Sequence, residues 1–425
     1  MLICEHDARL GGWAAPRIVP YPAAAAEGAS AAADSAALPP TSPLPGVLSP
    51  ALQALHYGGS CFEGMKAYPS AVDGTPLLFR PDLNARRFAR SAARLGLAPW
   101  NSNDLLACLA ALLRKDKAWL PTAPGHSLYL RPFAYACEPG LGVHAPNRTA
   151  VAVIMSPVGP YFRSGAAPVS LLLDQERVRA WPGGTGSYKI CGNYAPTVVP
   201  QAEAARAHGC AQVLYTMPAA ALVSGGGGGG GGPELSLPPG VALGDRVVGE
   251  CGAMNVFFLL DDDDGASSEL VTPPLDDGTI LPGVTRASVL ELAREWAAGG
   301  GGLVAGGKRQ LRVSERHVTV RELREAAARG RLREVFGTGT ACVVQPVSEL
   351  VVAAGAEAAG GVERLAAPGS SAEAVAAAAG AAAASSSSSP LWARLGAALA
   401  DIQYGRVPGG HPWSVRTADL LRDGA

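Results

Sequence analysis

The sequence predicts an α/β or α+β protein with two domains. The chain has 425 residues, of which 48% are hydrophobic and 17% are charged, a composition that fits a folded protein with room for two or three domains. Helix-like and strand-like stretches are mixed on both sides of a Pro- and Gly-rich segment, PVGPYFRSGAAP. We therefore expect a smaller N-terminal domain over residues 1–160, a linker over 161–168 and a larger C-terminal domain over 169–425.

Four segments of biased composition interrupt this pattern. They are rich in Ala, Gly, Ser or Pro and cover residues 22–44, 225–232, 299–302 and 353–390. Such segments bury too little apolar surface to offset the entropy of ordering them. We predict surface loops or disorder without chemistry, although the Ala run over 373–384 also has the propensity to form a helix.

Two secondary-structure elements follow from periodicity. Residues 285–297 place apolar side chains at helical spacing after the Leu-Pro-Gly breaker, with Thr285 available as the cap. Residues 127–133 alternate, so Leu128 and Leu130 share one face of a strand while Tyr129 and Arg131 share the other.

Several function classes find no support. A formal net charge of -1 gives no field that favours nucleic acid or an anionic membrane. There is no apolar run of the roughly 18 residues that a membrane span requires. The eight cysteines form no CxxC or metal-spaced pair, and neither HExxH nor GxSxG occurs. We expect a soluble intracellular protein without a metal, a nucleic-acid partner or a membrane.

A lysine in a glycine-flanked, apolar segment is the first candidate for chemistry. The segment is WPGGTGSYKICGNYAP, in which Tyr188 and Ile190 flank Lys189, so the P-loop pattern of Gly-Lys-Ser/Thr is not met. A solvated surface lysine is the ordinary interpretation. A partly desolvated lysine, however, has a lowered pKa and suits a Schiff base, as in enzymes that use pyridoxal phosphate (PLP).

The sequence also offers partners for such a cofactor. Glu250 stands at the head of an apolar stretch and could meet a pyridine nitrogen. The helix that opens at Thr285 offers N–H groups and a positive dipole end to a phosphate, and the glycines of 336–341 allow close approach to an anion. Each has an ordinary alternative, namely a loop carboxylate, a helix cap and a tight turn, but their joint presence favours a PLP site.

Seven motifs, spread from about residue 11 to residue 415, resemble one family closely. The motifs are ALHYGGSCFEGMKAY, FRPDLNARRFARSAARL, LYLRPF, GGTGSYKICGNYAP, LPGVTRASVLELA, EVFGTGTACVVQPV and DIQYGR. They resemble the branched-chain amino acid aminotransferases, PLP enzymes of fold type IV, and within them the eukaryotic-type subgroup. The resemblance implies a two-domain fold with PLP between the domains and a homodimer, in which Leu141 and Val143 belong to a loop that reaches the second subunit.

The resemblance also implies the roles of individual residues. Lys189 would carry the Schiff base and move the proton at the substrate Cα. The cofactor would further be held by Arg87, Tyr194, Glu250, Val284, Thr285 and Thr340. In these roles Tyr194 meets the phenolic oxygen, Glu250 meets the ring nitrogen, and the other residues meet the phosphate. For Arg87 the ordinary alternative is a solvated position on a basic helix.

A mostly apolar substrate pocket is implied as well. It would be lined by Tyr57, Phe62, Tyr129, Arg131, Tyr161, Thr340 and Ala341. Such a pocket suits an aliphatic side chain, and Tyr129 with Arg131 could receive the second carboxylate of glutamate. A surface arginine packed beside a tyrosine, and plain core positions for Tyr57 and Phe62, are the ordinary alternatives.

The expected reaction is transamination of leucine, isoleucine or valine with 2-oxoglutarate. Another fold-type IV activity, such as a D-amino acid aminotransferase or an aminodeoxychorismate lyase, is an alternative, and so is a non-catalytic homologue. The first residues, MLICEHDARLGGW, resemble the interior of the family's first domain, so we expect an incomplete N-terminus. Plastid, mitochondrion and cytosol all stay open, as do the direction of the reaction and the preference among the three amino acids.

Overall fold

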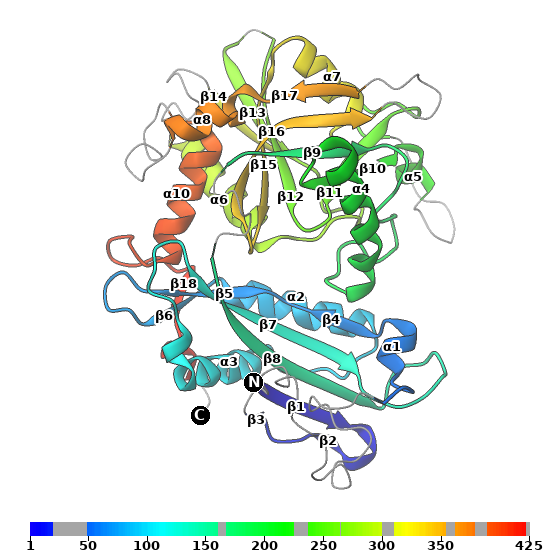
Figure 1. Cartoon of the computed structure of the whole chain (residues 1–425), viewed down its shortest axis with the longest axis vertical. Helices are drawn as coiled ribbons and strands as arrows, with labels where there is room; N and C mark the ends of the chain where they lie inside the picture. Colours follow the sequence, from blue (N-terminus) through cyan, green and yellow to red (C-terminus); the bar gives the residue numbers. More distant parts are fainter. Residues whose placement is uncertain are drawn as a thin grey trace. The chain divides into compact units, whose positions relative to one another are not determined.

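A computed structural model shows how these segments fold (Figure 1). It describes residues 1–19, 49–159, 167–224, 237–263, 265–299, 310–353, 362–378 and 389–421. The chain divides into two compact units. Unit 1 comprises Met1–Gly159, Tyr188–Gly192 and Ile402–Ala425, and unit 2 comprises Pro160–Ser187 and Asn193–Asp401. Unit 1 thus includes the lysine segment and the C-terminal segment, both of which lie within the residues expected to form the C-terminal domain.

Unit 1 is built on an antiparallel sheet of nine strands. The order is β18-β6-β5-β7-β8-β1-β2, with β3 paired to β1 and β4 paired to β7. The strands are β1 (Leu2–Asp7), β2 (Gly12–Trp13), β3 (Arg17–Ile18), β4 (Ser60–Phe62), β5 (Met65–Pro69), β6 (Pro76–Phe79), β7 (Ser127–Ala136), β8 (Arg148–Val158) and β18 (Ser414–Arg416). The predicted alternation in β7 is confirmed, because Leu128 and Leu130 are fully buried while Tyr129 and Arg131 are only partly buried.

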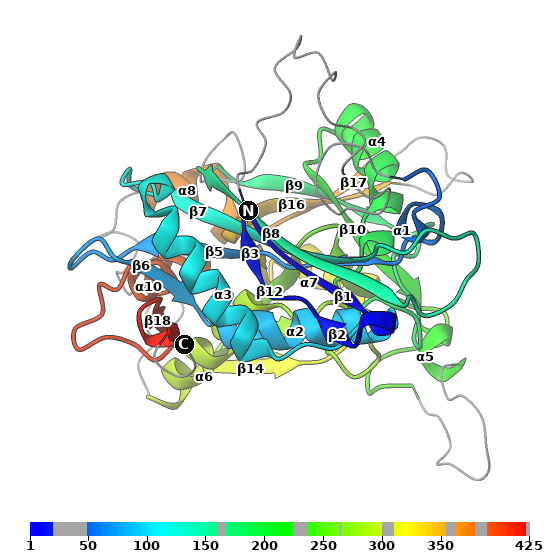
Figure 2. The same ribbon diagram turned by 90° about the horizontal axis from the view of Figure 1, so that it is seen from below.

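Two amphipathic helices pack against this sheet. The helices of unit 1 are α1 (Gln53–Tyr57), α2 (Pro81–Arg94) and α3 (Ser102–Lys115), with short 3-10 turns at Ala8–Leu10, Lys117–Trp119, Cys191–Asn193 and Asp419–Leu421. Helices α2 and α3 lie side by side (Figure 2). Phe88 of α2 and Leu109 of α3 are completely buried and join Leu128 of β7 in one core.

Unit 2 is built on a mixed sheet of nine strands. The order is β11-β10-β9-β16-β15-β12-β13-β14, with β17 paired to β16. The strands are β9 (Val169–Asp174), β10 (Gln212–Pro218), β11 (Arg246–Cys251), β12 (Asn255–Asp261), β13 (Ser267–Thr272), β14 (Gln310–Glu315), β15 (Leu332–Gly339), β16 (Val343–Ala353) and β17 (Val362–Ala366). The β9–β10, β9–β16 and β13–β14 pairs are parallel. Strand β12 is buried along its whole length, in keeping with the five successive apolar residues, 256–260, between Asn255 and Asp261.

Helices surround this second sheet. They are α4 (Val198–His208), α5 (Ala220–Ser224), α6 (Val284–Ala298), α7 (Val320–Ala328), α8 (Ala372–Ala377) and α10 (Leu391–Gln403), with 3-10 turns at Ala195–Thr197 and Pro368–Ser370. The helix expected from residue 285 is confirmed as α6, but Thr285 does not cap it. The N-cap is Gly283, without a side-chain hydrogen bond, and Thr285 lies inside the first turn.

The biased segments fall mainly outside the described residues. This holds for 22–44, for 225–232, for 300–302 and for much of 353–390. The loop prediction is wrong for part of the last segment, because Val362–Ala366 forms β17 and pairs with β16, while α8 occupies the start of the Ala run. No helix in the described ranges is long and apolar enough to cross a lipid bilayer.

Candidate active site

In unit 1 the backbone around Lys189 is fastened to α2 and β4. The Lys189 N–H donates to Ser91 Oγ at 2.9 Å, and its carbonyl accepts from the Phe62 N–H at 3.1 Å. Ser91 is completely buried and donates in turn to the Arg87 carbonyl at 3.0 Å. Helix α2 therefore positions both Arg87 and the predicted Schiff-base lysine.

A buried carboxylate lies between these two cations. Glu63 is 0% exposed and accepts from Arg87 Nε at 2.9 Å and from Arg87 Nη2 at 2.6 Å. Burial alone would raise the pKa of Glu63, but the Arg87 guanidinium and the Lys189 ammonium outweigh it and hold that pKa below its usual range. Arg87 is itself only 7% exposed, so the solvated-helix alternative is wrong for this residue.

Three of the predicted substrate residues gather beside Lys189. Its Nζ lies 4.9 Å from the centre of the Phe62 ring, and the Arg131 guanidinium lies 4.7 Å from the same ring. Arg131 Nη2 donates to Tyr129 Oη at 3.1 Å, whereas the buried Arg131 Nε has no hydrogen-bond partner in the described residues. A Cβ on Gly64 would stand 2.1 Å from Tyr129 Oη, so the tyrosine requires glycine there.

The other predicted pocket residues of unit 1 are not gathered in this way. Tyr57 ends α1, is 42% exposed, and donates its hydroxyl hydrogen to the carbonyl of Leu141. Leu141 and Val143 are 70% and 82% exposed. Tyr161 lies outside the described residues.

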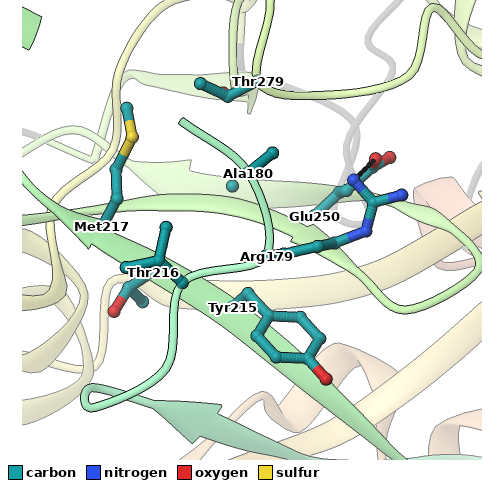
Figure 3. Close-up of a pocket in the computed structure, with 9 residues that line it drawn as sticks. Arg179, Ala180, Tyr215, Thr216, Met217, Glu250 and Thr279 are labelled. Atoms are coloured by element: carbon teal, nitrogen blue, oxygen red, sulfur yellow. Dashed lines mark ion pairs between the residues drawn. The ribbon is translucent and has the colours of Figure 1, made fainter. Parts of the chain in front are cut away.

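In unit 2 the predicted carboxylate is buried and is held by two hydrogen-bond donors and an ion pair. Glu250, in β11, is 4% exposed. It accepts from the Leu281 N–H at 3.0 Å and from Asn255 Nδ2 at 2.9 Å, and it forms an ion pair with Arg179, whose Nη1 lies 2.7 Å from its Oε1. Figure 3 shows the Arg179 guanidinium beside this carboxylate. Tyr194 lies in the same neighbourhood, because its ring centre is 6.0 Å from the Arg179 guanidinium carbon.

A small cavity opens next to Glu250. Its lining residues are Val178, Arg179, Ala180, Tyr215, Thr216, Met217, Gly249, Glu250 and Thr279 (Figure 3). Its volume is about 20 Å³, which holds a water molecule but no cofactor ring. The cavity is therefore too small to be the cofactor cleft.

The same hydrogen-bond network sets the start of α6. Asn255 Nδ2 also donates to the Leu281 carbonyl at 3.0 Å. A Cβ on Gly283 would stand 2.1 Å from Asn255 Oδ1, so only glycine fits before the helix. Gly283 has no side chain to cap α6, so the N–H groups of the first turn, which includes Val284 and Thr285, are not capped by the N-cap residue, and a helix start of this kind favours an anion.

Thr340 and Ala341 lie in the turn between β15 and β16. Gly339 pairs with Val343 across this turn, and Val343 adopts a φ of 59°, which a β-branched residue rarely does. The neighbouring Thr338 Oγ1 is buried without a hydrogen-bond partner in the described residues.

The residues fit PLP in donor chemistry. Within unit 1 there are an amine and a buried guanidinium, and within unit 2 there are a buried carboxylate and a helix start without a side-chain cap; each is a kind of group that binds PLP. Sequence reasoning missed Glu63, Arg179 and Asn255. A carboxylate inside the apolar run CFEGMKAY was a usable signal for Glu63, whereas no local pattern marks Arg179 or Asn255.

Comparison with known proteins agrees with this arrangement. Residues 242–350 match the family model for amino-transferase class IV. A mitochondrial branched-chain-amino-acid aminotransferase from Bos taurus is 44% identical over 305 residues, which cover 72% of this chain and 67% of that protein. One from Dictyostelium discoideum is 40% identical over 303 residues, covering 71% of this chain and 69% of that protein. The chain belongs to the branched-chain-amino-acid aminotransferase family.

This membership confirms the eukaryotic-type resemblance and a PLP-dependent transferase family. A cytosolic relative from Mus musculus is 42% identical over 305 residues, covering 72% of this chain and 68% of that protein. The fold matches a branched-chain aminotransferase from Thermoproteus uzoniensis solved with norvaline, with a TM-score of 0.57, 22% identity, and coverage of 86% of this chain and 92% of that one. The enzyme of Thermobaculum terrenum in its PLP form gives a TM-score of 0.58 at 19% identity, covering 85% and 90%. These likenesses confirm the type IV fold.

Proposed function

We propose that this chain transfers amino groups between branched-chain L-amino acids and glutamate, with PLP bound to Lys189. The observation that carries the proposal is the group formed by Arg87 of α2, Glu63 directly after β4, and Lys189, whose backbone is bonded to both elements. The relatives named above support the substrate class.

PLP, when bound, supplies an electrophilic aldehyde and an electron-accepting ring. Lys189 would bond to the aldehyde carbon and afterwards carry the proton at the substrate Cα. Arg87 would hold the phosphate, together with the first-turn N–H groups of Val284 and Thr285 and with Thr340. The ion pair with Glu63 keeps the Arg87 guanidinium in one orientation.

Glu250 would hold the ring nitrogen protonated. The hydrogen bonds from Asn255 and Leu281 and the ion pair with Arg179 fix the carboxylate in one orientation, which is the preorganisation that such a contact requires. Tyr194 would donate to the phenolic oxygen of the ring.

The pocket would accept two kinds of side chain. The Phe62 ring offers apolar surface to leucine, isoleucine and valine. The unsatisfied Nε of Arg131, with Tyr129 beside it, would receive the second carboxylate of glutamate. Tyr57, Tyr161 and the Ala341 N–H would complete this pocket. Exposed Leu141 and Val143 would pack against the second subunit of a homodimer.

The test compares Lys189→Ala with Lys115→Ala, a substitution of an exposed lysine at the end of α3. Both proteins are incubated with PLP, reduced with borohydride and digested, and the modified peptide is identified by mass spectrometry. We expect the label on Lys189 in the Lys115→Ala protein and no label in the Lys189→Ala protein. The same amount of label in the Lys189→Ala protein, carried by another lysine, would refute the site.

The substrate class is tested separately with the unaltered chain. We expect glutamate to form from 2-oxoglutarate and L-leucine, L-isoleucine or L-valine. A higher rate with D-alanine than with L-leucine would replace this proposal by a D-amino acid aminotransferase, and a folded chain that takes up no PLP would point to a non-catalytic homologue.

A further inference from the structure

Three side chains that could ligate a metal converge in unit 2, although they are distant in sequence. Asp276 and Asp277 lie in the loop between β13 and α6, and His317 follows β14. A ligand atom from each of the three lies within 4.8 Å of the others. His317 Nδ1 faces Asp277 Oδ2 at 4.0 Å, and these two side chains are only 8% and 10% exposed.

The histidine nitrogen lacks the hydrogen bond that its burial demands. His317 Nδ1 is buried and has no hydrogen-bond partner in the described residues. The 4.0 Å gap to Asp277 Oδ2 is too wide for a hydrogen bond but leaves room for an atom that bonds to both. An unsatisfied buried polar atom calls for a missing partner.

The ligand atoms are held in place by other contacts. Asp277 Oδ1 accepts from the Thr279 N–H at 2.9 Å and from Thr279 Oγ1 at 2.8 Å, which leaves Oδ2 turned toward the histidine. On the other side, the Val318 carbonyl accepts from the Val248 N–H at 2.8 Å, which fixes the backbone next to His317 to β11.

The charge balance also favours a cation. The loop contributes two carboxylates. The cation next in sequence, Arg316, is already bonded to Glu269 at 2.7 Å and to Glu322 at 2.7 Å, so its charge is matched by those two residues. The two carboxylates beside His317 therefore provide negative charge that a divalent ion can balance.

We propose that Asp276, Asp277 and His317 bind one divalent cation of the zinc class. Imidazole nitrogen and carboxylate oxygen are ligands that zinc takes, and three protein ligands leave a fourth position for water. Zinc–ligand bonds of about 2.1 Å in a tetrahedron place the ligand atoms about 3.4 Å apart. The 4.0 Å between Asp277 and His317 thus needs to close by less than an ångström, and exposed Asp276 gives the ion a path from solvent.

The bound ion would stiffen the loop that serves Glu250. Thr279, which is bonded to Asp277, lines the cavity beside Glu250, and Leu281 further along the loop donates to Glu250. Val318, which follows His317, is bonded to the strand that carries Glu250. The role assigned to the cation is structural, because it ties the two segments that frame this carboxylate. This cation site could not be predicted from the sequence, because the spacing of its three ligands matches no metal-binding motif.

The test titrates the PLP-loaded full chain, stripped with a chelator, with Zn²⁺ by calorimetry and by thermal unfolding. Asp277→Asn keeps the Oδ1 acceptor for Thr279 but removes the charge, and His317→Gln removes the imidazole. His208→Gln, at the end of α4, is the matched control. We expect one equivalent bound with a raised Tm in the unaltered chain and in the control, and an affinity at least about tenfold weaker in both site variants.

Equal Zn²⁺ affinity in all four proteins would assign the ion to other groups, such as the eight cysteines, and would overturn the proposal. Absence of binding to the unaltered chain would overturn it as well. If His317→Gln does not fold, Asp276→Asn replaces it in the comparison. None of these readouts depends on turnover, so they are independent of the transaminase assignment.

Discussion

Glu63 Oε1 and Arg87 Nη2 lie 2.6 Å apart in a place that solvent does not reach, with side chains 0% and 7% exposed. The neighbouring residue of the same helix, Arg86, forms an ion pair of the same 2.6 Å length with Asp82, but those side chains are 65% and 55% exposed. The buried pair is also bidentate, because Glu63 accepts from both Nε and Nη2 of Arg87, whereas Arg86 donates to Asp82 through Nη2 within one helix. The two pairs therefore contrast a buried bidentate ion pair with a solvated local one.

Glu63→Gln is expected to lower the free energy of unfolding by about 3–5 kcal/mol, because it leaves a buried guanidinium without its counter-ion. Asp82→Asn is the matched control and should change it by less than about 1 kcal/mol, because solvent screens the exposed pair. Urea unfolding of the proteins without PLP measures both, because the phosphate that Arg87 is proposed to hold would otherwise supply a second counter-ion. Similar losses in the two variants would contradict the buried role of Glu63.

The lowered pKa of Glu63 also determines how the free energy of unfolding changes as the pH falls. Its folded-state pKa lies below the unfolded value, so its contribution to stability is present above the unfolded pKa and is lost as pH falls through the folded pKa. The difference in unfolding free energy between the unaltered chain and Glu63→Gln should therefore become smaller as the pH falls. A gap that stays constant from neutral pH into acid would show that the charge of Glu63 is not what stabilises the fold.

The pKa of Glu334 is shifted in the opposite direction, so its effect on stability has the opposite pH dependence. It lies in β15, and its buried carboxylate meets the start of α10, where it accepts from the N–H groups of Leu391 at 2.9 Å and Trp392 at 3.0 Å; burial raises its pKa to about 7. A raised acid pKa gives stability that is fully present below the unfolded pKa, near 4.5, and that is lost as pH rises to about 7. The loss amounts to at most about 3 kcal/mol.

Glu334→Gln serves to isolate this effect. As the pH rises from 4.5 to 7, the unaltered chain should lose stability relative to the variant, because glutamine does not titrate. The substitution also changes the hydrogen bonds to Leu391 and Trp392, but that contribution does not depend on pH. Unfolding in urea at several pH values gives this difference. If this difference does not change with pH, Glu334 does not titrate between pH 4.5 and 7, and the prediction is wrong.

Local patterns predicted what depends on neighbours in sequence. The alternation of Leu128 with Tyr129 and the helical spacing around Val289 are set by burial of one face, and both are found in the structure. Contacts between segments that are distant in sequence could not be predicted from such local patterns. The bond from Ser91 to Lys189 joins residues 98 apart, and the partners of Glu250 come from three different segments. Such proximity follows from the folding of the whole sheet.

Arg131→Met is expected to separate the two kinds of substrate. The guanidinium would bond to the second carboxylate of glutamate or 2-oxoglutarate, an interaction of about 1.5–3 kcal/mol, so the KM for 2-oxoglutarate should rise about tenfold to a hundredfold. The rate of the half-reaction with L-leucine should change little, because leucine has no second carboxylate. Steady-state and single-turnover kinetics with each substrate provide the measurement.

Arg90→Met is a suitable control, because Arg90 lies on α2 over the Tyr188 ring and has no assigned role in substrate binding. It should leave the KM for 2-oxoglutarate near that of the unaltered chain. Equal loss of the leucine and 2-oxoglutarate reactions in Arg131→Met would mean that Arg131 supports the pocket without recognising the carboxylate.

Val343, directly after the turn that carries Thr340 and Ala341, adopts a φ of 59°. For a β-branched residue this conformation costs about 1–2 kcal/mol, whereas Asn tolerates it. Val343→Asn should therefore raise the free energy of unfolding by about 1 kcal/mol, and Val343→Thr, which keeps the branch at Cβ, should not. Thermal unfolding of the PLP-loaded proteins makes the comparison. Stabilisation by Thr equal to that by Asn would show that the backbone at this position is not strained.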